Sequence, residues 1–242
     1  MISPFQSASM IVSIILSMII PIVVIAKYRK TKGFFKAFLF GLFMSFAQSI
    51  GANLLNLFVL NLLKDPSTGV VQVTYLLIVI SVVIDVVSFL AAYLLARYLL
   101  KSVEDSKALN AVKAFSYTLM YAVSISVSMV TYFLASFPYN AGRLDEIYTG
   151  DNLAKVELLF EGADSFFFLV FGLLAIVSWI FVNTVLNTDS KDPRRLIKMA
   201  LIMLVYVLIN LAFSSNVLPS IVFVTGLMVL ISLYIRKLRV KQ

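Results

Sequence analysis

The 242-residue chain contains neither cysteine nor histidine. Disulfide bonds, thiol nucleophiles, zinc sites built on Cys or His, haem ligation by these residues and imidazole bases are therefore excluded. Charged residues are also scarce, at 13% of the chain, whereas 61% of the residues are hydrophobic and the mean hydropathy is +1.00. A soluble domain has roughly 45–50% apolar and about 25% charged residues. The composition therefore predicts an integral membrane protein.

Long apolar runs occur throughout the sequence. A bilayer core of about 30 Å needs about 20 apolar residues per helix, and seven stretches come close to this length or exceed it. We therefore predict an all-α, polytopic membrane protein in which residues 1–242 form one bundle of about seven transmembrane helices. The predicted spans are 8–26, 38–63, 75–100, 114–137, 165–186, 199–213 and 217–235.

The Lys and Arg residues are distributed unequally between the two ends of these spans. If the N-terminus lies outside, 17 of the 20 fall in the inner segments 27–36, 97–113, 191–198 and 236–241. The positive-inside rule then predicts a multi-pass protein of the cytoplasmic membrane with its N-terminus outside and its C-terminus inside. Topogenic signals and contact with anionic lipids at the inner face explain the net charge of +8. Nucleic-acid binding is not needed to explain it.

The one sizeable segment between spans, residues 138–164, lies on the predicted outer side and contains six acidic residues. Its second half, residues 151–161, has the spacing of an amphipathic helix, with Leu153, Val156 and Leu159/Phe160 on the apolar face. Two interpretations remain open: a solvated acidic loop, or a lid or docking site for a basic partner.

Polar residues inside the spans are informative because each needs a partner where water is absent. Asp85 is the only acid that the pattern places inside the membrane, and no span has a central Lys or Arg to pair with it. Its carboxyl group can be neutral and hydrogen-bonded, can serve a proton- or cation-coupled function, or can lie nearer the interface than the span suggests. Ser and Thr stripes on neighbouring spans predict a hydrogen-bonded interior with a small cavity.

Small and amide residues in the spans point to helix packing rather than chemistry. Three small-residue pairs allow helices to approach closely, namely Ser13/Ser17, Ala47/Gly51 and Ala92/Ala96. The amides Asn53, Asn56 and Asn61 are predicted to cap or bridge helices. Nucleotide-binding loops and metal-binding His pairs are absent from the sequence, and we predict no cofactor and no metal site.

Several segments resemble the YhfC family of bacterial intramembrane proteases, glutamic-type relatives of the CAAX prenyl endopeptidases. They are residues 10–25 with the basic run at 27–30 and Ala37-Phe38-Leu39-Phe40-Gly41, then Ala96-Arg97-Tyr98-Leu99-Leu100-Lys101, Leu119-Met120-Tyr121 and Tyr206-Val207-Leu208-Ile209-Asn210. The resemblance implies a helical membrane fold in which a carboxylate activates water beside His and Asn groups.

The residues that would perform this chemistry are missing. In this alignment the paired glutamates fall at Ser88 and Phe89, the following arginine at Ala92, the histidine and glutamate of span four at Ile125 and Met129, and the late histidine at Tyr206. Only Asn210 is retained. The resemblance therefore implies a non-catalytic relative with no catalytic residues. Its former active-site cavity would be lined by Asp85, Ser88, Tyr121, Ser124, Ser128, Tyr206 and Asn210.

Three functions remain open on the sequence. The first is a regulatory, scaffold or immunity-type protein that binds a membrane peptide or protein partner. The second is a small proton- or cation-coupled transporter, or a transporter subunit, that uses Asp85. The third is residual intramembrane proteolysis, for which a Ser–Lys dyad would need a membrane-embedded lysine; the only candidate is Lys113, at the inner edge of span four. The lack of a clear internal repeat favours the first.

Overall fold

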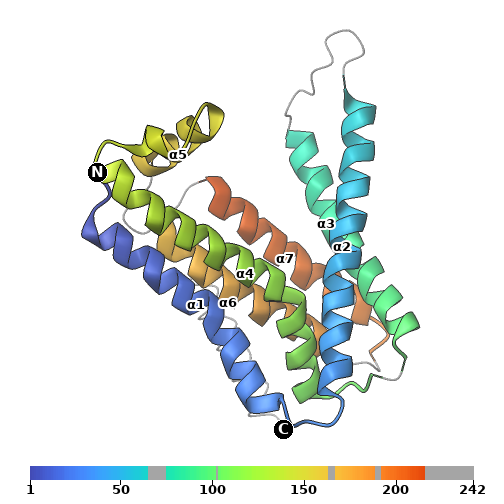
Figure 1. Cartoon of the computed structure of the whole chain (residues 1–242). Coiled ribbons are helices and arrows are strands. Elements are labelled where there is room, and N and C mark those ends of the chain that lie inside the picture. The colour runs from blue at the N-terminus through green and yellow to red at the C-terminus, as the bar shows by residue number, and fades with distance from the viewer. Residues whose placement is uncertain (65–74, 102, 163–166, 189–191, 216–242) are drawn as a thin grey trace. The chain divides into compact units, whose positions relative to one another are not determined.

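Helices are the only regular elements in the part of the chain that the structure, a computed structural model, describes: residues 1–64, 75–101, 103–162, 167–188 and 192–215. The α-helices and one short 3₁₀ helix, η1, follow one another along the chain (Figure 1). They are α1 (Pro4–Tyr28), α2 (Phe34–Leu63), α3 (Tyr75–Leu99), α4 (Lys107–Asn140), η1 (Leu144–Glu146), α5 (Asp151–Gly162), α6 (Phe167–Leu186) and α7 (Arg195–Ser215).

Five of these helices, α1, α2, α3, α4 and α6, are long and apolar enough to cross a membrane. The prediction of an all-α polytopic membrane protein is therefore confirmed. The sixth predicted span, 199–213, lies within α7, which is not among the five. The seventh, 217–235, lies outside the described residues. The total of seven spans and their orientation stay predictions.

Local sequence determines where two of the long helices begin. Ser3 precedes α1, and its hydroxyl accepts a hydrogen bond from the Gln6 backbone N–H at 3.2 Å, while the Gln6 side chain accepts one from the Ser3 N–H at 2.7 Å. This reciprocal arrangement is a capping box, followed by Pro4 in the first helical position, where the missing N–H costs nothing. Ser106 caps α4 in a similar way, because its hydroxyl accepts from the Leu109 N–H at 3.2 Å.

The described residues group into two compact units. Unit 1 contains Met1–Ile20, Tyr121–Val177 and the described part of Ile209–Gln242, and unit 2 contains Pro21–Met120 and Ser178–Leu208. Four helices, α1, α4, α6 and α7, contribute residues to both units along their length.

In unit 1, α1 packs closely against α6 and α4. The Ser13 hydroxyl donates to the backbone carbonyl of Phe168, and the Ser17 and Ser126 hydroxyls are 2.6 Å apart. Both Ser13 and Ser17 are buried, as expected of small residues at a helix contact. Where α4 ends, next to the start of α1, the Asn140 side chain hydrogen-bonds both the N–H and the carbonyl of Ile2, at 2.6 and 3.1 Å.

The predicted amphipathic helix at 151–161 is present as α5, in unit 1. Phe160 is buried against Tyr139 and Phe168, with ring centroids 4.9 and 6.5 Å apart, and Leu153, Val156 and Leu159 pack on the same apolar cluster. Leu158, on the opposite side, is exposed. The apolar face of α5 therefore packs against the buried cluster of unit 1. The choice between a solvated acidic segment and a lid or docking site remains untested.

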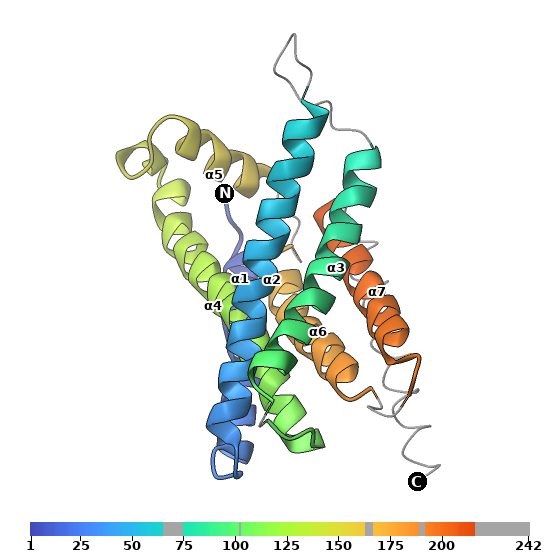
Figure 2. The ribbon, with the colours of Figure 1, turned by 90° about the vertical axis from the view of Figure 1, so that its right-hand side faces the viewer.

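In unit 2, α2 and α3 run side by side as an antiparallel pair (Figures 1 and 2). The buried core of this unit draws on α2, α3, α4, α6 and α7. Ala92 and Ala96, predicted to allow close approach, are both buried in it. Its largest members are Phe40, Met44, Phe89, Tyr93, Leu186, Met199 and Met203.

Gly41 lies where α2 crosses α4. A Cβ atom at this position would overlap both the side chain of Ser116 and the backbone carbonyl of Lys113, so only glycine fits. Gly51, ten residues later on the same helix, is under no such restriction: a Cβ there would meet the Ser88 hydroxyl at 3.8 Å, an ordinary contact. The two glycines therefore provide a matched pair.

We expect Gly41→Ala to lower the melting temperature of the protein in mild detergent, because overpacking at a backbone contact costs about 1–3 kcal/mol. Gly51→Ala should leave the melting temperature unchanged or raise it slightly, since alanine favours helix by up to about 1 kcal/mol. Thermal unfolding followed by size-exclusion chromatography compares the two. Equal effects of both substitutions would contradict the close crossing of α2 and α4.

Candidate functional site

The predicted cavity-lining residues do not all belong to one unit. Asp85, Ser88 and Tyr206 lie in unit 2, whereas Tyr121, Ser124, Ser128 and Asn210 lie in unit 1. Tyr121 and Ser124 are exposed, and Ser128 and Asn210 are half-buried. A single cavity lined by all seven residues stays a prediction.

Two of the three residues in unit 2, Asp85 and Tyr206, adjoin hydrogen-bonded polar side chains. The Tyr117 hydroxyl of α4 donates to the Gln48 side chain of α2, and Tyr117 is within electrostatic reach of Asp85 and Tyr206. The Gln48 amide is 3.5 Å from the backbone carbonyl of Asp85 in α3. Separately, the Tyr206 and Ser178 hydroxyls of α7 and α6 are 2.7 Å apart. The predicted hydrogen-bonded interior is thus present.

Ser88 differs from its neighbours. Its side chain is buried, faces Gly51 of α2, and its hydroxyl has no hydrogen-bond partner among the described residues. The serine that the resemblance aligns with the family's first glutamate therefore has no base hydrogen-bonded to its hydroxyl in this part of the chain.

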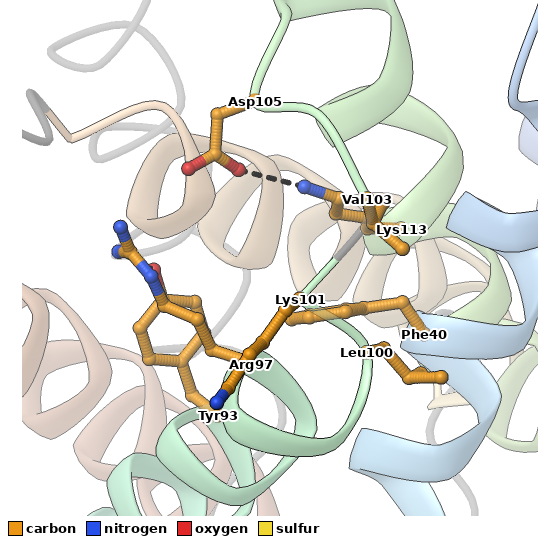
Figure 3. A pocket seen from close by; sticks show the side chains of 8 residues that line it. All are labelled: Phe40, Tyr93, Arg97, Leu100, Lys101, Val103, Asp105 and Lys113. Atoms are coloured by element: carbon orange, nitrogen blue, oxygen red, sulfur yellow. Dashed lines mark hydrogen bonds and ion pairs between the residues drawn. The ribbon is translucent and has the colours of Figure 1, made fainter.

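A pocket of about 160 Å³ lies in unit 2, at the end of α3 that leads into α4 (Figure 3). None of the predicted cavity-lining residues reaches it. It is lined by residues of α2, α3, α4 and the α3–α4 connection, namely Phe40, Tyr93, Arg97, Leu100, Lys101, Val103, Asp105 and Lys113.

Lys113 is the buried charge of this pocket, with 3% of its side chain exposed. Its ammonium group donates to the Asp105 carboxylate at 2.7 Å, to the Glu104 carbonyl at 3.1 Å and to the Asn110 side chain at 3.1 Å. An ammonium has three protons to donate, so all of them are used. Figure 3 shows the Lys113 side chain extended towards Asp105.

This geometry answers one question raised by the sequence. A Ser–Lys dyad needs a neutral lysine amine that accepts the proton of a serine hydroxyl. The nearest serine along α4, Ser116, instead donates its hydroxyl to the backbone carbonyl of Lys113, at 3.1 Å. Lys113 is thus arranged as a charged structural group and not as a base.

Two aromatic rings hold the cations of the pocket in place. Phe40 and Tyr93 meet edge to face with centroids 6.3 Å apart, and the Lys113 ammonium lies 5.0 Å from the centre of the Phe40 ring. One Arg97 nitrogen donates to the Tyr93 hydroxyl at 3.1 Å, and the Arg195 guanidinium lies 5.4 Å from the centre of the Tyr93 ring. Such cation–π contacts favour positive charge beside an aromatic face.

In the sequence these cations mark the predicted inner face, and Arg97 and Lys101 also belong to a segment that resembles the protease family. A signal is present in the spacing: Tyr93 and Arg97 are four residues apart on one face of α3, and Lys101 follows after another four residues, just beyond the end of the helix at Leu99. The sequence marks Lys113 as a candidate base and gives no sign of its role in the pocket. Arg195 begins α7 almost a hundred residues later, and no local sequence signal indicates that it contacts the Tyr93 ring.

Among the described residues there is no group of three or more acidic side chains that could hold a metal ion. Comparison with known protein families, with curated proteins and with solved structures finds no match to this chain. The resemblance to intramembrane proteases therefore rests on the sequence segments alone.

The pair of Lys113 and Asp105 leads to an asymmetric prediction. Asp105→Ala leaves the buried ammonium without its anion and should destabilise the protein by about 3 kcal/mol, at the low end of what such a change costs. Lys113→Met removes the buried charge and leaves Asp105, 38% exposed, to water. We expect Lys113→Met to lower the melting temperature less than Asp105→Ala, and the double variant to recover part of the loss.

Glu146→Ala is the control, because Glu146 pairs with Arg143 where both side chains are more than half exposed, and exposed pairs contribute about 0–1 kcal/mol. Melting temperatures in detergent compare the variants. If Asp105→Ala behaved like Glu146→Ala, the ion pair would not hold the pocket together.

Proposed function

We propose that this chain is a non-catalytic membrane protein that binds a transmembrane helix of a peptide or protein partner along the C-terminal half of α2. The lack of catalytic groups in the sequence and the full engagement of Lys113 support the non-catalytic part of the proposal. The observation that carries the binding part is a pair of exposed amides on an otherwise apolar helix face.

Asn53 and Asn61 are exposed on α2 and make no hydrogen bond to another described residue. The residues around them are large, apolar and likewise exposed: Leu54 by 63%, Leu57 by 58% and Phe58 by 62%. An unpaired amide in hydrocarbon is unfavourable, and asparagine side chains promote association of transmembrane helices for this reason. This face of α2 therefore suits a partner helix better than it suits lipid.

Two partners are conceivable for this face, and an experiment separates them. One is a second polypeptide, as we propose. The other is the predicted seventh span of the same chain, residues 217–235, which lies outside the described residues. The natural absence of cysteine helps, because any introduced cysteine is the only thiol in the protein.

The test places a single cysteine at Leu57 and attaches a thiol-reactive photo-crosslinker in membranes of the source cells. We expect an adduct of higher mass that contains a second polypeptide, and a severalfold lower yield when Asn53→Leu is added. Leu201→Cys on α7, with 57% of the original side chain exposed, is the matched control and should crosslink to lipid only. A crosslink that maps to residues 217–235 of the same chain, or no protein adduct, would refute the proposal.

A second function, coupled transport, is favoured by the placement of Asp85. This half-buried acid of α3 shares the interior of unit 2 with the Gln48 amide and the Tyr117 hydroxyl. A carboxyl group in such a half-buried environment is favoured in its neutral form, and an acid of this kind can release and rebind a proton.

Asp85→Asn separates this alternative from partner binding. If the chain transports ions, the variant should assemble normally in membranes and lose proton- or cation-dependent uptake in vesicles. If the chain only binds a partner, we expect unchanged crosslinking from Leu57→Cys and no ion flux in either protein. Uptake that is abolished by Asp85→Asn would establish the second function in place of the first.

A further inference from the structure

The pocket of unit 2 carries more positive charge than its own carboxylate can balance. Arg97, Lys101 and Lys113 line it, and Asp105 is the one carboxylate that the described residues contribute to the lining. Arg195 is not a lining residue, but its guanidinium lies 5.4 Å from the centre of the ring of Tyr93, which is one. Lys113 is within electrostatic reach of both Arg97 and Arg195. Asp105 is committed to Lys113, so Arg97 and Lys101 have no carboxylate in the lining, and Arg195 adds a third positive charge next to Tyr93.

Arg195 is the clearest sign that something is to be bound. The residue is only 6% exposed, yet its Nε and one terminal nitrogen, Nη1, have no hydrogen-bond partner among the described residues. A guanidinium is always charged and presents five N–H donors in a rigid fork. A buried charge with unused donors is unfavourable unless an acceptor occupies the adjoining space.

We propose that this pocket binds a phosphate group, held by the guanidinium groups of Arg97 and Arg195 with Lys101 at the rim. The ligand comes either from the headgroup of an anionic phospholipid or from a phosphate-bearing solute. The site is separate from the exposed face of α2, so the proposal stands independently of partner binding.

Size and charge both favour a phosphate. A cavity of about 150 Å³ accepts a molecule as large as benzene, and the 160 Å³ of this pocket therefore has room for the five heavy atoms of a phosphate. A phosphomonoester carries about −1.5 to −2 charges at neutral pH, which matches three unbalanced cations better than a single carboxylate does. Guanidinium groups bind phosphate oxygens through paired, charge-assisted hydrogen bonds.

The predicted location of the pocket in the membrane also favours a phosphate ligand. Its cations belong to segments 97–113 and 191–198, which the sequence assigns to the inner face, where the anionic headgroups are found. Diffuse attraction would require only exposed charges. A buried Arg195 with two nitrogens that make no hydrogen bond to the described residues, next to a ring that lines the cavity, is what distinguishes a site from a charged surface.

The test uses the full-length protein purified in an uncharged detergent. Inorganic phosphate and short-chain phosphatidic acid are titrated separately, with chloride at equal ionic strength and short-chain phosphatidylcholine as references, and the melting temperature is recorded. We expect a saturable rise with at least one phosphate ligand and none with the references. A rise with phosphatidic acid alone identifies the lipid source, and a rise with both identifies the phosphate group itself as sufficient.

Neighbouring arginines provide the matched variants. Arg195→Gln should raise the half-saturating concentration about tenfold or more, as expected for loss of a charge-assisted contact, whereas Arg194→Gln, exposed and one residue earlier, should leave it unchanged. If Arg195→Gln does not fold, the exposed Arg97→Gln serves instead. No saturable rise with either ligand, or an equal loss in Arg194→Gln, would overturn the proposal.

Discussion

A lysine ammonium that leaves water must find oxygen acceptors for all its protons, and this requirement organises one end of unit 2. Lys113 meets it with acceptors from Glu104, Asp105 and Asn110. Asn110 in turn donates to the Leu186 carbonyl at 2.9 Å, which connects α4 to the end of α6. Since the ammonium also lies over the Phe40 ring of α2, one buried charge links three helices and the α3–α4 connection.

The same requirement explains the contacts further along these helices. Where water is absent, polar side chains bond to one another or to backbone carbonyls, as Gln48 does with Tyr117 and Ser178 does with Tyr206. The exceptions are then informative. Asn53 and Asn61 on α2, the Ser88 hydroxyl and the Arg195 guanidinium lack such partners in the described part of the chain, and two of these places carry the proposals made for this protein.

The helices could be predicted from hydropathy because a bilayer imposes both length and composition on a span. The helix α4 extends beyond its predicted span, 114–137, to Lys107–Asn140. The added N-terminal part of the helix includes Lys113. A hydropathy profile ends the span at this residue because lysine is charged, and the profile contains no information on the neighbours that hydrogen-bond the ammonium. The fold class therefore followed from the sequence, whereas the true length of this helix depended on tertiary contacts.

The pocket could not be predicted from the sequence for a related reason. The spacing of Tyr93, Arg97 and Lys101 was visible, but the meeting of α3 with Phe40 and Arg195 depends on how distant helices pack. The polar residues chosen from the sequence did include real members of the interior, Asp85 and Tyr206. They could not be separated from Tyr121 and Ser124, which are exposed, because all four follow helical periodicity equally well.

The predicted topology assigns the segments that hold the pocket's cations to the inner face of a membrane and the acidic segment 138–164 to the outer face. Labelling of single cysteines in intact cells with a membrane-impermeant maleimide tests it directly, because the native chain has no thiol. Two exposed positions report the two sides, Glu157→Cys on α5 and Arg194→Cys, one residue before α7. The account predicts labelling of Glu157→Cys in intact cells and of Arg194→Cys only after permeabilisation. Labelling of Arg194→Cys in intact cells would contradict it.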